Sequence, residues 1–272
     1  PAVRGCPGGC AFCGLVSHQG RTVISRSEDS IVEQIHKRAE NKSFKGTISD
    51  IGGAAGNIYG SEARDFEKCR KCRRSSCLFP KQCPNFKIDE KRLLALLRRI
   101  RALPEVKHLY INSGIRLDLA NRQPELMREL VRHHVSGHLK VAPEHLNPKV
   151  LKLMRKNPAE DFFQFKAFFE QESLDAGKEQ YLIPLFISNF PGCTETEMKT
   201  VDNFLDRCNW SPQQVQDYIP LPMTMGAAMY YTGKDSNGNP IKVNRGLRER
   251  RSQINVLKKV RRGSRRKKSR RR

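Results

Sequence analysis

Short apolar runs alternate with amphipathic runs along the 272 residues of this chain, and this alternation limits the possible folds more than any other feature. The apolar runs are rich in β-branched or aromatic residues and end near Gly, Pro, Ser or Asn, as β-strands do. They predict strands at residues 46–51, 106–113, 138–142, 180–188 and 214–219, with a further one ending near Val3.

Helical patterns lie between these strands. Ser27 is placed to cap one helix, and Thr194 with Glu197 forms a capping box before another. Apolar residues recur at helical spacing in residues 31–35, 93–100 and 162–169. We expect these stripes to be core rather than binding surface.

Strands that alternate with helices imply βαβ units and a parallel sheet, so the predicted fold class is α/β. Five or six strands favour a partial (β/α)6 TIM-like barrel over a complete eight-unit barrel. We assign residues 1–235 to this core, residues 60–88 to a Cys-rich insertion within it, and residues 236–272 to a basic tail. The loops after the strands are expected to build the functional site.

The charge of the chain is unevenly spread. The net charge is +23, and residues 245–272 contribute +14 of it through 15 Lys or Arg against one Glu. A run with so few apolar residues and so much self-repulsion is expected to be disordered. Basic runs also bind phosphate without reading sequence, which leaves open an RNA contact or a nuclear address for this tail.

The chain begins with Pro1 rather than Met, and we interpret it as a fragment that lacks an N-terminal part. No stretch approaches the roughly 18 apolar residues of a membrane span, and no secretory signal is visible. Seven of the nine cysteines fall in two tight groups, which suits metal ligation in a reducing compartment. We therefore expect a cytoplasmic protein without a membrane partner, in which Cys193 and Cys208 are small buried residues.

The segment RGCPGGCAFC places Cys6, Cys10 and Cys13 in C-x3-C-x2-C spacing. A closed structural zinc or iron–sulfur site usually takes four protein ligands, so three thiolates leave one metal position open. A [4Fe–4S] cluster held in this way keeps one iron free for an exogenous ligand, and the glycines at 8 and 9 let the loop wrap closely around it. The alternative is a three-cysteine zinc site completed by His18.

With Phe12 before the last cysteine, this motif resembles the signature of the radical SAM enzymes, and SDIGG at residues 49–53 resembles their glycine motif after the second strand. The sequence is most similar to the YgiQ-type radical SAM proteins over about residues 4–235, although that family normally carries a further N-terminal region. The segments that carry this resemblance are RGCPGGCAFC, SRSEDSI, ISDIGGAAGN, SGIRLDLA, HHVSGHLKVAPEH, AGKEQYLIPLFIS and MYYTGK.

The resemblance implies an iron–sulfur enzyme. Cys6, Cys10 and Cys13 would hold three irons of a [4Fe–4S] cluster, and S-adenosylmethionine would chelate the fourth. One electron would cleave the sulfonium C–S bond to give a 5′-deoxyadenosyl radical, which would abstract hydrogen from an unknown substrate. A one-electron donor of the flavodoxin or ferredoxin type is the implied partner.

Further cofactor-binding candidates follow from the resemblance and from their places after strands. Gly52 and Gly53 are expected to approach the methionyl end, because only glycine allows such close backbone contact. Arg116 offers a planar fork to a carboxylate. The candidates for the remaining carboxylate, ribose or adenine contacts are Ser113, Glu144 and Phe12. For each of them, a satisfied polar group or a core side chain is the alternative.

The second cysteine group, CRKCRRSSCLFPKQC, brings Cys69, Cys72, Cys77 and Cys83 close together in the sequence. Four cysteines at such spacing indicate a metal site, which leaves open an auxiliary iron–sulfur cluster, a structural zinc, or four free thiols. The two cysteine groups and the basic tail also fit a second class of function, a non-catalytic, metal-stabilised nucleic-acid-binding protein.

Overall fold

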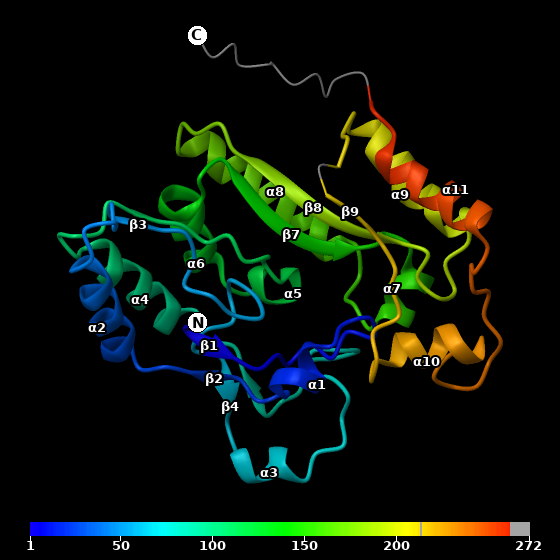
Figure 1. Ribbon diagram of the computed structural model, residues 1–272, viewed down its shortest axis with the longest axis horizontal. Helices are drawn as coiled ribbons and strands as arrows, with labels where there is room; N and C mark the ends of the chain where they lie inside the picture. The colour runs from blue at the N-terminus through cyan, green and yellow to red at the C-terminus, as the bar shows by residue number, and fades with distance from the viewer. Residues whose placement is uncertain (213, 262–272) are drawn as a thin grey trace.

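A computed structural model describes residues 1–212 and 214–261 (Figure 1). Its strands are β1 (Val3–Arg4), β2 (Ile24–Ser25), β3 (Thr47–Ile48), β4 (Glu62–Ala63), β5 (Phe86–Lys87), β6 (His108–Leu109), β7 (His138–Glu144), β8 (Tyr181–Ser188) and β9 (Val215–Asp217). Its helices are α1 (Leu15–Gln19), α2 (Glu28–Ala39), α3 (Phe66–Arg70), α4 (Lys91–Arg101), α5 (Leu117–Ala120), α6 (Pro124–Glu129), the π-helix η1 (Leu130–His134), α7 (Pro148–Met154), α8 (Glu160–Asp175), α9 (Glu195–Arg207), α10 (Met225–Thr232) and α11 (Leu247–Lys258).

Parallel strands form the centre of the fold, which confirms the predicted mixed α/β class. β7, β8 and β9 make a three-stranded parallel sheet, and β3 pairs in parallel with β6. A parallel bridge between Ile115 and Val141 joins these two groups. Next to β1, the Ala2 N–H donates to the Ile51 carbonyl at 2.8 Å. Within residues 1–212 and 214–261, β9 does not pair with β1, so the barrel is open.

The strands that carry the expected site are shorter than predicted. Only Thr47–Ile48 and His108–Leu109 pair as strands within the predicted runs 46–51 and 106–113. Beyond these paired residues, a side chain replaces the backbone ladder: Asn112 donates from Nδ2 to the Ser49 carbonyl at 2.8 Å. The backbone also turns at Gly52, where φ is +77°. Both segments therefore leave the sheet where polar residues follow.

The predicted helix starts and core stripes are confirmed. Ser27 accepts a hydrogen bond from the Ser30 N–H at the start of α2, and Thr194 with Glu197 forms the expected capping box at the start of α9. In α4, Leu93 and Leu97 are completely buried. Figure 1 shows α2 and α4 together beside β3, with α8 alongside β7 and β8.

The expectation of a disordered basic tail is wrong for residues 247–258, which form α11. This helix packs against α9, β8 and β9, in red beside α9 in Figure 1. Leu257 is completely buried, and Gln253 accepts from the Asn189 N–H and donates to the Cys193 carbonyl, both at 2.9 Å. These contacts outweigh the self-repulsion of the basic residues. The structure also describes residues 236–246 and 259–261 of the predicted tail, and Pro240 forms a bridge with Lys234 of the core. Residues 262–272 lie outside the described residues, as does any RNA contact made there.

Among the helices of residues 1–212 and 214–261, none combines the length and the apolar character that a membrane span needs.

Candidate functional site

The first cysteine loop lies between β1 and α1 and is held from several sides. Cys6 is buried, while Cys10 and Cys13 are half-buried. The Ala11 N–H donates to the last carbonyl of α7 at 2.9 Å, and the Ala11 carbonyl accepts from the Gly226 N–H of α10 at 2.7 Å. The backbone between the cysteines is therefore fixed by the two helices that follow β7 and β9.

The thiols of this loop influence one another. Burial raises the pKa of Cys6, the guanidinium of Arg116 opposes that rise, and the charge of Cys10 adds to it. Burial likewise raises the pKa of Cys13, and the charges of Cys10 and Cys6 contribute. Three soft thiolate donors that suffer from mutual repulsion suit a cationic iron–sulfur cluster. Within the described part of the chain, no three His, Cys, Asp or Glu side chains already have the spacing of a metal-ion site.

Arg116 lies against the cysteine loop, immediately after the bridge residue Ile115. Its Nη1 is 3.7 Å from the Cys10 sulfur, and its Nε and Nη2 bind both carboxylate oxygens of Asp118 at 3.0 and 2.5 Å. Burial works against its charge, but Asp118 and Cys10 outweigh burial and hold the pKa of Arg116 well above its usual range. A Cβ at Gly8 would come 2.3 Å from Nη1, so glycine there allows this contact.

Glu144 ends β7 and is buried with an unusual backbone. Its φ is +64°, a value that few residues other than glycine adopt. Burial raises the pKa of its carboxyl, while Lys156 and Arg116 partly oppose the rise. Its charge also contributes to the raised pKa of Cys13. Glu144 is therefore near enough for its charge to act on Cys13 of the cysteine loop and on Arg116.

Ser113 and Asp50 connect the ends of β6 and β3. The Ser113 hydroxyl donates to one carboxylate oxygen of Asp50, and the other accepts from the Gly52 N–H at 3.2 Å. Gly52 and Gly53 pack closely against the first residues of the chain. A Cβ at Gly52 would lie 3.0 Å from Pro1, and a Cβ at Gly53 would lie 2.6 Å from Val3.

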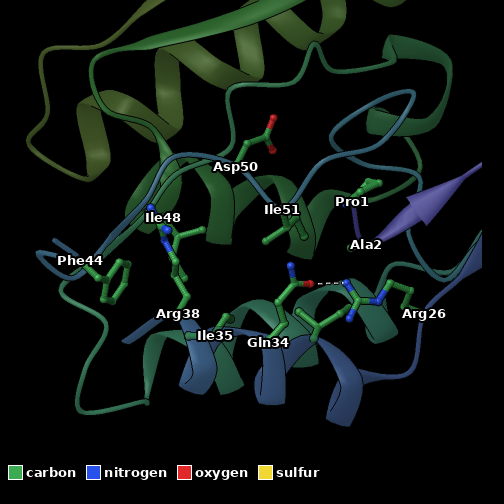
Figure 2. Close-up of a pocket in the computed structure, with 11 residues that line it drawn as sticks. Pro1, Ala2, Arg26, Gln34, Ile35, Arg38, Phe44, Ile48, Asp50 and Ile51 are labelled. Atoms are coloured by element: carbon green, nitrogen blue, oxygen red, sulfur yellow. Dashed lines mark hydrogen bonds between the residues drawn. The ribbon is translucent and has the colours of Figure 1, made fainter. Parts of the chain in front are cut away.

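A cavity of about 290 Å³ lies between the end of β3 and α2, and Figure 2 shows that the Asp50 carboxylate points away from that helix.

Phe12 packs its ring edge-on to Phe190, with the centroids 6.5 Å apart. It therefore has a core contact as well as its place beside Cys13.

The second cysteine group lies directly against the first cysteine loop. The Cys77 N–H donates to the Pro7 carbonyl at 2.8 Å, and the Cys83 N–H donates to the Cys77 carbonyl at 2.7 Å. Cys69, Cys72 and Cys77 line one cavity of about 220 Å³. Burial raises the pKa of Cys77, and the charges of Cys83, Cys69 and Cys72 add to the rise. All four thiols therefore gather in one region.

Several residues of the site were missed by the sequence analysis. Asp118 is the buried partner of Arg116, and Asn57 holds the Arg116 backbone by accepting from its N–H at 2.9 Å. Lys156 donates to the Ala142 carbonyl at 2.7 Å beside Glu144. The Arg-x-Asp spacing after a strand was a signal for Asp118, because the two side chains form a pair two residues apart. Asn57 and Lys156 gave no comparable signal.

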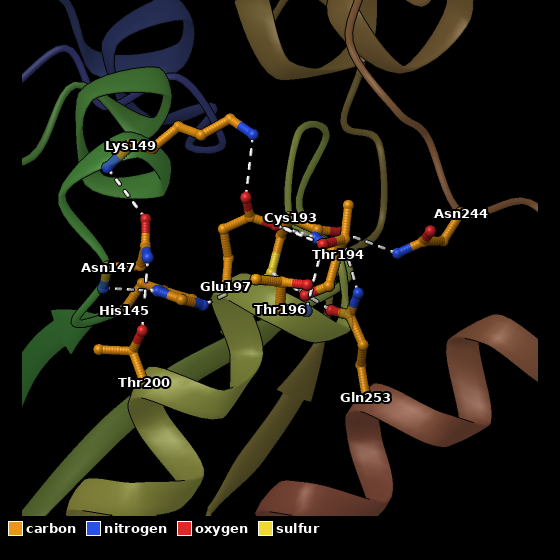
Figure 3. A network of polar contacts seen from close by, with 10 residues as sticks. All are labelled: His145, Asn147, Lys149, Cys193, Thr194, Thr196, Glu197, Thr200, Asn244 and Gln253. Carbon is orange, nitrogen blue, oxygen red and sulfur yellow. Dashed lines mark hydrogen bonds and ion pairs between the residues drawn. The ribbon is translucent and has the colours of Figure 1, made fainter.

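A buried polar network joins the loops after β7 and β8 (Figure 3). The Asn147 N–H donates to Nδ1 of His145 at 2.9 Å, and Nε2 of His145 is 3.5 Å from the Cys193 sulfur. Burial raises the pKa of Cys193 to about 12, so this thiol stays protonated, as expected of a small buried residue. The same expectation is wrong for Cys208, which is exposed at the end of α9.

Residues 1–166 match the radical SAM superfamily, and the chain therefore belongs to it. It is 45% identical over 255 residues to a UPF0313 protein of Geobacter sulfurreducens, covering 93% of this chain and 42% of that one. It is 42% identical over 240 residues to a UPF0313 protein of Porphyromonas gingivalis, covering 85% and 38%. These relatives support the YgiQ type within the superfamily. The chain spans less than half the length of either relative.

Two solved structures of TsrM, a radical S-adenosylmethionine methyltransferase from Kitasatospora setae, share the fold. The structure with tryptophan and a SAM analogue has a TM-score of 0.51 at 12% identity, and the match covers 94% of this chain and 50% of that one. The structure with cobalamin and a [4Fe–4S] cluster has a TM-score of 0.52 at 12% identity, and the match covers 96% and 47%. At this identity, the two structures show that the chain shares their fold.

Proposed function

We propose that this chain is the core of a radical SAM enzyme that reductively cleaves S-adenosylmethionine to a 5′-deoxyadenosyl radical and passes the radical to a substrate that is still unknown. The observation that carries the proposal is the meeting of three elements. The three-cysteine loop, the Arg116–Asp118 pair and Glu144 come from separate βα units and lie together.

In this proposal, Cys6, Cys10 and Cys13 bind three irons of a [4Fe–4S] cluster and leave the fourth iron open. When bound, that cluster supplies the electron that breaks the sulfonium bond. Arg116 offsets the negative charge that the thiolates carry, and Asp118 fixes the direction of its guanidinium. A water-poor site makes this charge pairing stronger than it would be in solvent.

The other predicted residues are proposed to bind the rest of S-adenosylmethionine. Glu144 has a buried carboxyl group that can accept hydrogen bonds from a ribose or an amine. The Ser113–Asp50 pair ends the neighbouring strands and offers polar groups to the methionyl end, beside Gly52 and Gly53. Phe12 would exclude water by packing between the loop and Phe190.

We also propose that Cys69, Cys72, Cys77 and Cys83 hold a second metal centre. Three of them line a cavity of about 220 Å³, several times the roughly 30 Å³ share of one water molecule. This space favours a multi-atom iron–sulfur cluster over a single zinc ion. Iron and sulfide analysis of a Cys6/Cys10/Cys13→Ala variant tests this, because iron retained there must be bound elsewhere. Zinc without sulfide, or no retained metal, would contradict the proposed cluster.

The catalytic proposal is tested by 5′-deoxyadenosine formation. The protein is reconstituted with iron and sulfide under anaerobic conditions, reduced with dithionite and mixed with S-adenosylmethionine. We expect 5′-deoxyadenosine from the wild type and from Cys208→Ala, whose cysteine is exposed and outside both groups. The Cys6/Cys10/Cys13→Ala variant should form none. No product from a fully loaded wild type would refute catalysis by this chain.

A further inference from the structure

The segment that contains the second cysteine group also carries a dense positive surface. Residues 70–81 contain five Lys or Arg and no Asp or Glu. All five side chains are exposed, and we call them the basic patch: Arg70, Lys71, Arg73, Arg74 and Lys81. Arg74 also holds its own loop together, since it donates to the Ser76 and Lys81 carbonyls at 3.1 and 2.7 Å. The patch is therefore a structured surface, not a loose basic run.

This patch is joined by backbone contacts to the first cysteine loop. The Cys77 N–H reaches the Pro7 carbonyl at 2.8 Å, and a Cβ at Gly9 would lie only 1.9 Å from the Ser75 carbonyl oxygen. Arg21, which follows α1, donates to the Cys72 carbonyl at 2.8 Å. Figure 1 shows α3 at the outer edge of this region, beneath β4 and α1. A molecule docked on the patch would thus lie next to both cysteine groups.

We propose that the basic patch is the docking surface for an acidic protein that carries a one-electron cofactor. The inference rests on the proposed function, because reductive cleavage of S-adenosylmethionine consumes one electron that the chain must receive. In each transfer the carrier is oxidised by one electron, and the centre on the cysteine loops is reduced by one.

The chemistry of the patch favours a protein carrier as its occupant. A concentrated positive surface attracts an acidic partner over a distance and orients it during the encounter. Electron transfer encounters bury little area and depend strongly on such steering. Phe66, at the start of α3, is 52% exposed and provides an apolar contact beside the charges. A nucleic acid would bind the same charges, but it has no need of a surface that lies next to the cysteine loops.

The test measures how fast an acidic reduced flavodoxin reduces the reconstituted protein, by stopped-flow absorbance under anaerobic conditions. The patch variant is Lys71→Glu/Arg73→Glu/Lys81→Glu, which leaves the clamp Arg74 in place. The control variant is Lys42→Glu/Lys45→Glu/Lys107→Glu, which makes the same change of charge at exposed lysines that precede β3 and β6. Dithionite, a small reductant that needs no docking surface, is used in parallel and tests the proposed function separately.

We expect flavodoxin to reduce the patch variant at least about tenfold more slowly than the wild type at low salt, and the control variant within about twofold of it. The wild-type rate should fall steeply as salt is added, since screening removes the attraction. Reduction by dithionite should be similar in all three proteins. A wild-type rate that does not depend on salt, or equal slowing of both variants, would overturn the docking proposal. If the reconstituted wild type forms no 5′-deoxyadenosine with dithionite, the proposed function itself is refuted.

Discussion

At the scale of single residues, the candidate site is organised by a buried ion pair. The Arg116 side chain is 11% exposed and that of Asp118 7%, and burial would penalise either charge alone. Burial raises the pKa of Asp118, but Arg116 outweighs burial and lowers it below its usual value. The sequence predicted Arg116 as a binding residue from its place after a strand, but could not show that a carboxylate already pairs with it.

Replacing Asp118 with Asn should destabilise the protein strongly. The guanidinium of Arg116 would stay buried beside the thiols without its counter-charge, which typically costs about 3 kcal/mol or more. Urea unfolding of the metal-free protein measures this free energy. Glu33→Gln is the control, because the Glu33–Lys37 pair is exposed and should matter little. Equal stability of Asp118→Asn and wild type would show that Arg116 does not depend on this partner.

The buried His145 should make the fold sensitive to mild acid. Burial lowers its pKa from 6.5 to about 4, and Glu197 only partly opposes this. Between those pH values the unfolded state binds a proton that the folded state does not, so stability falls as the pH drops below 6.5. From pH 7.5 to pH 5 the expected loss is about 2 kcal/mol.

Urea unfolding at the two pH values measures this loss, and the control is His145→Gln, which cannot titrate. Glu197 has a pKa of about 2 and adds little in this range. The variant should lose about 2 kcal/mol less than the wild type between pH 7.5 and pH 5. The same loss in both proteins would show that His145 is not the group responsible.

At the scale of elements, the sequence predicted regular patterns well and irregular ones poorly. The capping box at Thr194 and the apolar stripe of α4 follow from local spacing alone, and both are confirmed. α11 was missed because its basic residues dominate the composition, while its stability depends on distant partners such as Asn189 and Cys193. The contact between the two cysteine groups was likewise invisible, since it joins residues about seventy positions apart.

Gly9→Ala should loosen the Cys-rich segment from the cysteine loop. Its φ is +59°, and the new Cβ would meet the Ser75 carbonyl oxygen at 1.9 Å, so the backbone must move. We expect trypsin to cleave this variant faster than the wild type at residues 70–74. Mass spectrometry of the fragments measures the cleavage. Gly177→Ala is a matched control, because its φ is +63° but its Cβ would meet nothing within 4 Å. Equally fast cleavage in both variants would show that backbone strain, and not the lost contact with Ser75, causes the effect.

At the scale of the whole molecule, the parallel topology explains why distant residues meet. The carboxyl ends of parallel strands lie at one edge, so the segments after β6 and β7 place Arg116 and Glu144 at the same edge. The cysteine loop follows β1, which pairs antiparallel with β2, and it meets this edge where Arg116 contacts Cys10. The fold class and the cysteine motif could be predicted because they depend on local patterns. The partners of each side chain could not, because they depend on how the separate βα units pack.

The most direct test of the account is the low-temperature electron paramagnetic resonance spectrum of the reduced protein, before and after S-adenosylmethionine is added. A cluster held by only Cys6, Cys10 and Cys13 has an open position, so we expect its g-values to shift on addition in the wild type. The Cys6/Cys10/Cys13→Ala variant should show no such shift, even if a second cluster remains. A wild-type spectrum unchanged by S-adenosylmethionine would contradict the claim that the three-cysteine loop presents an open iron.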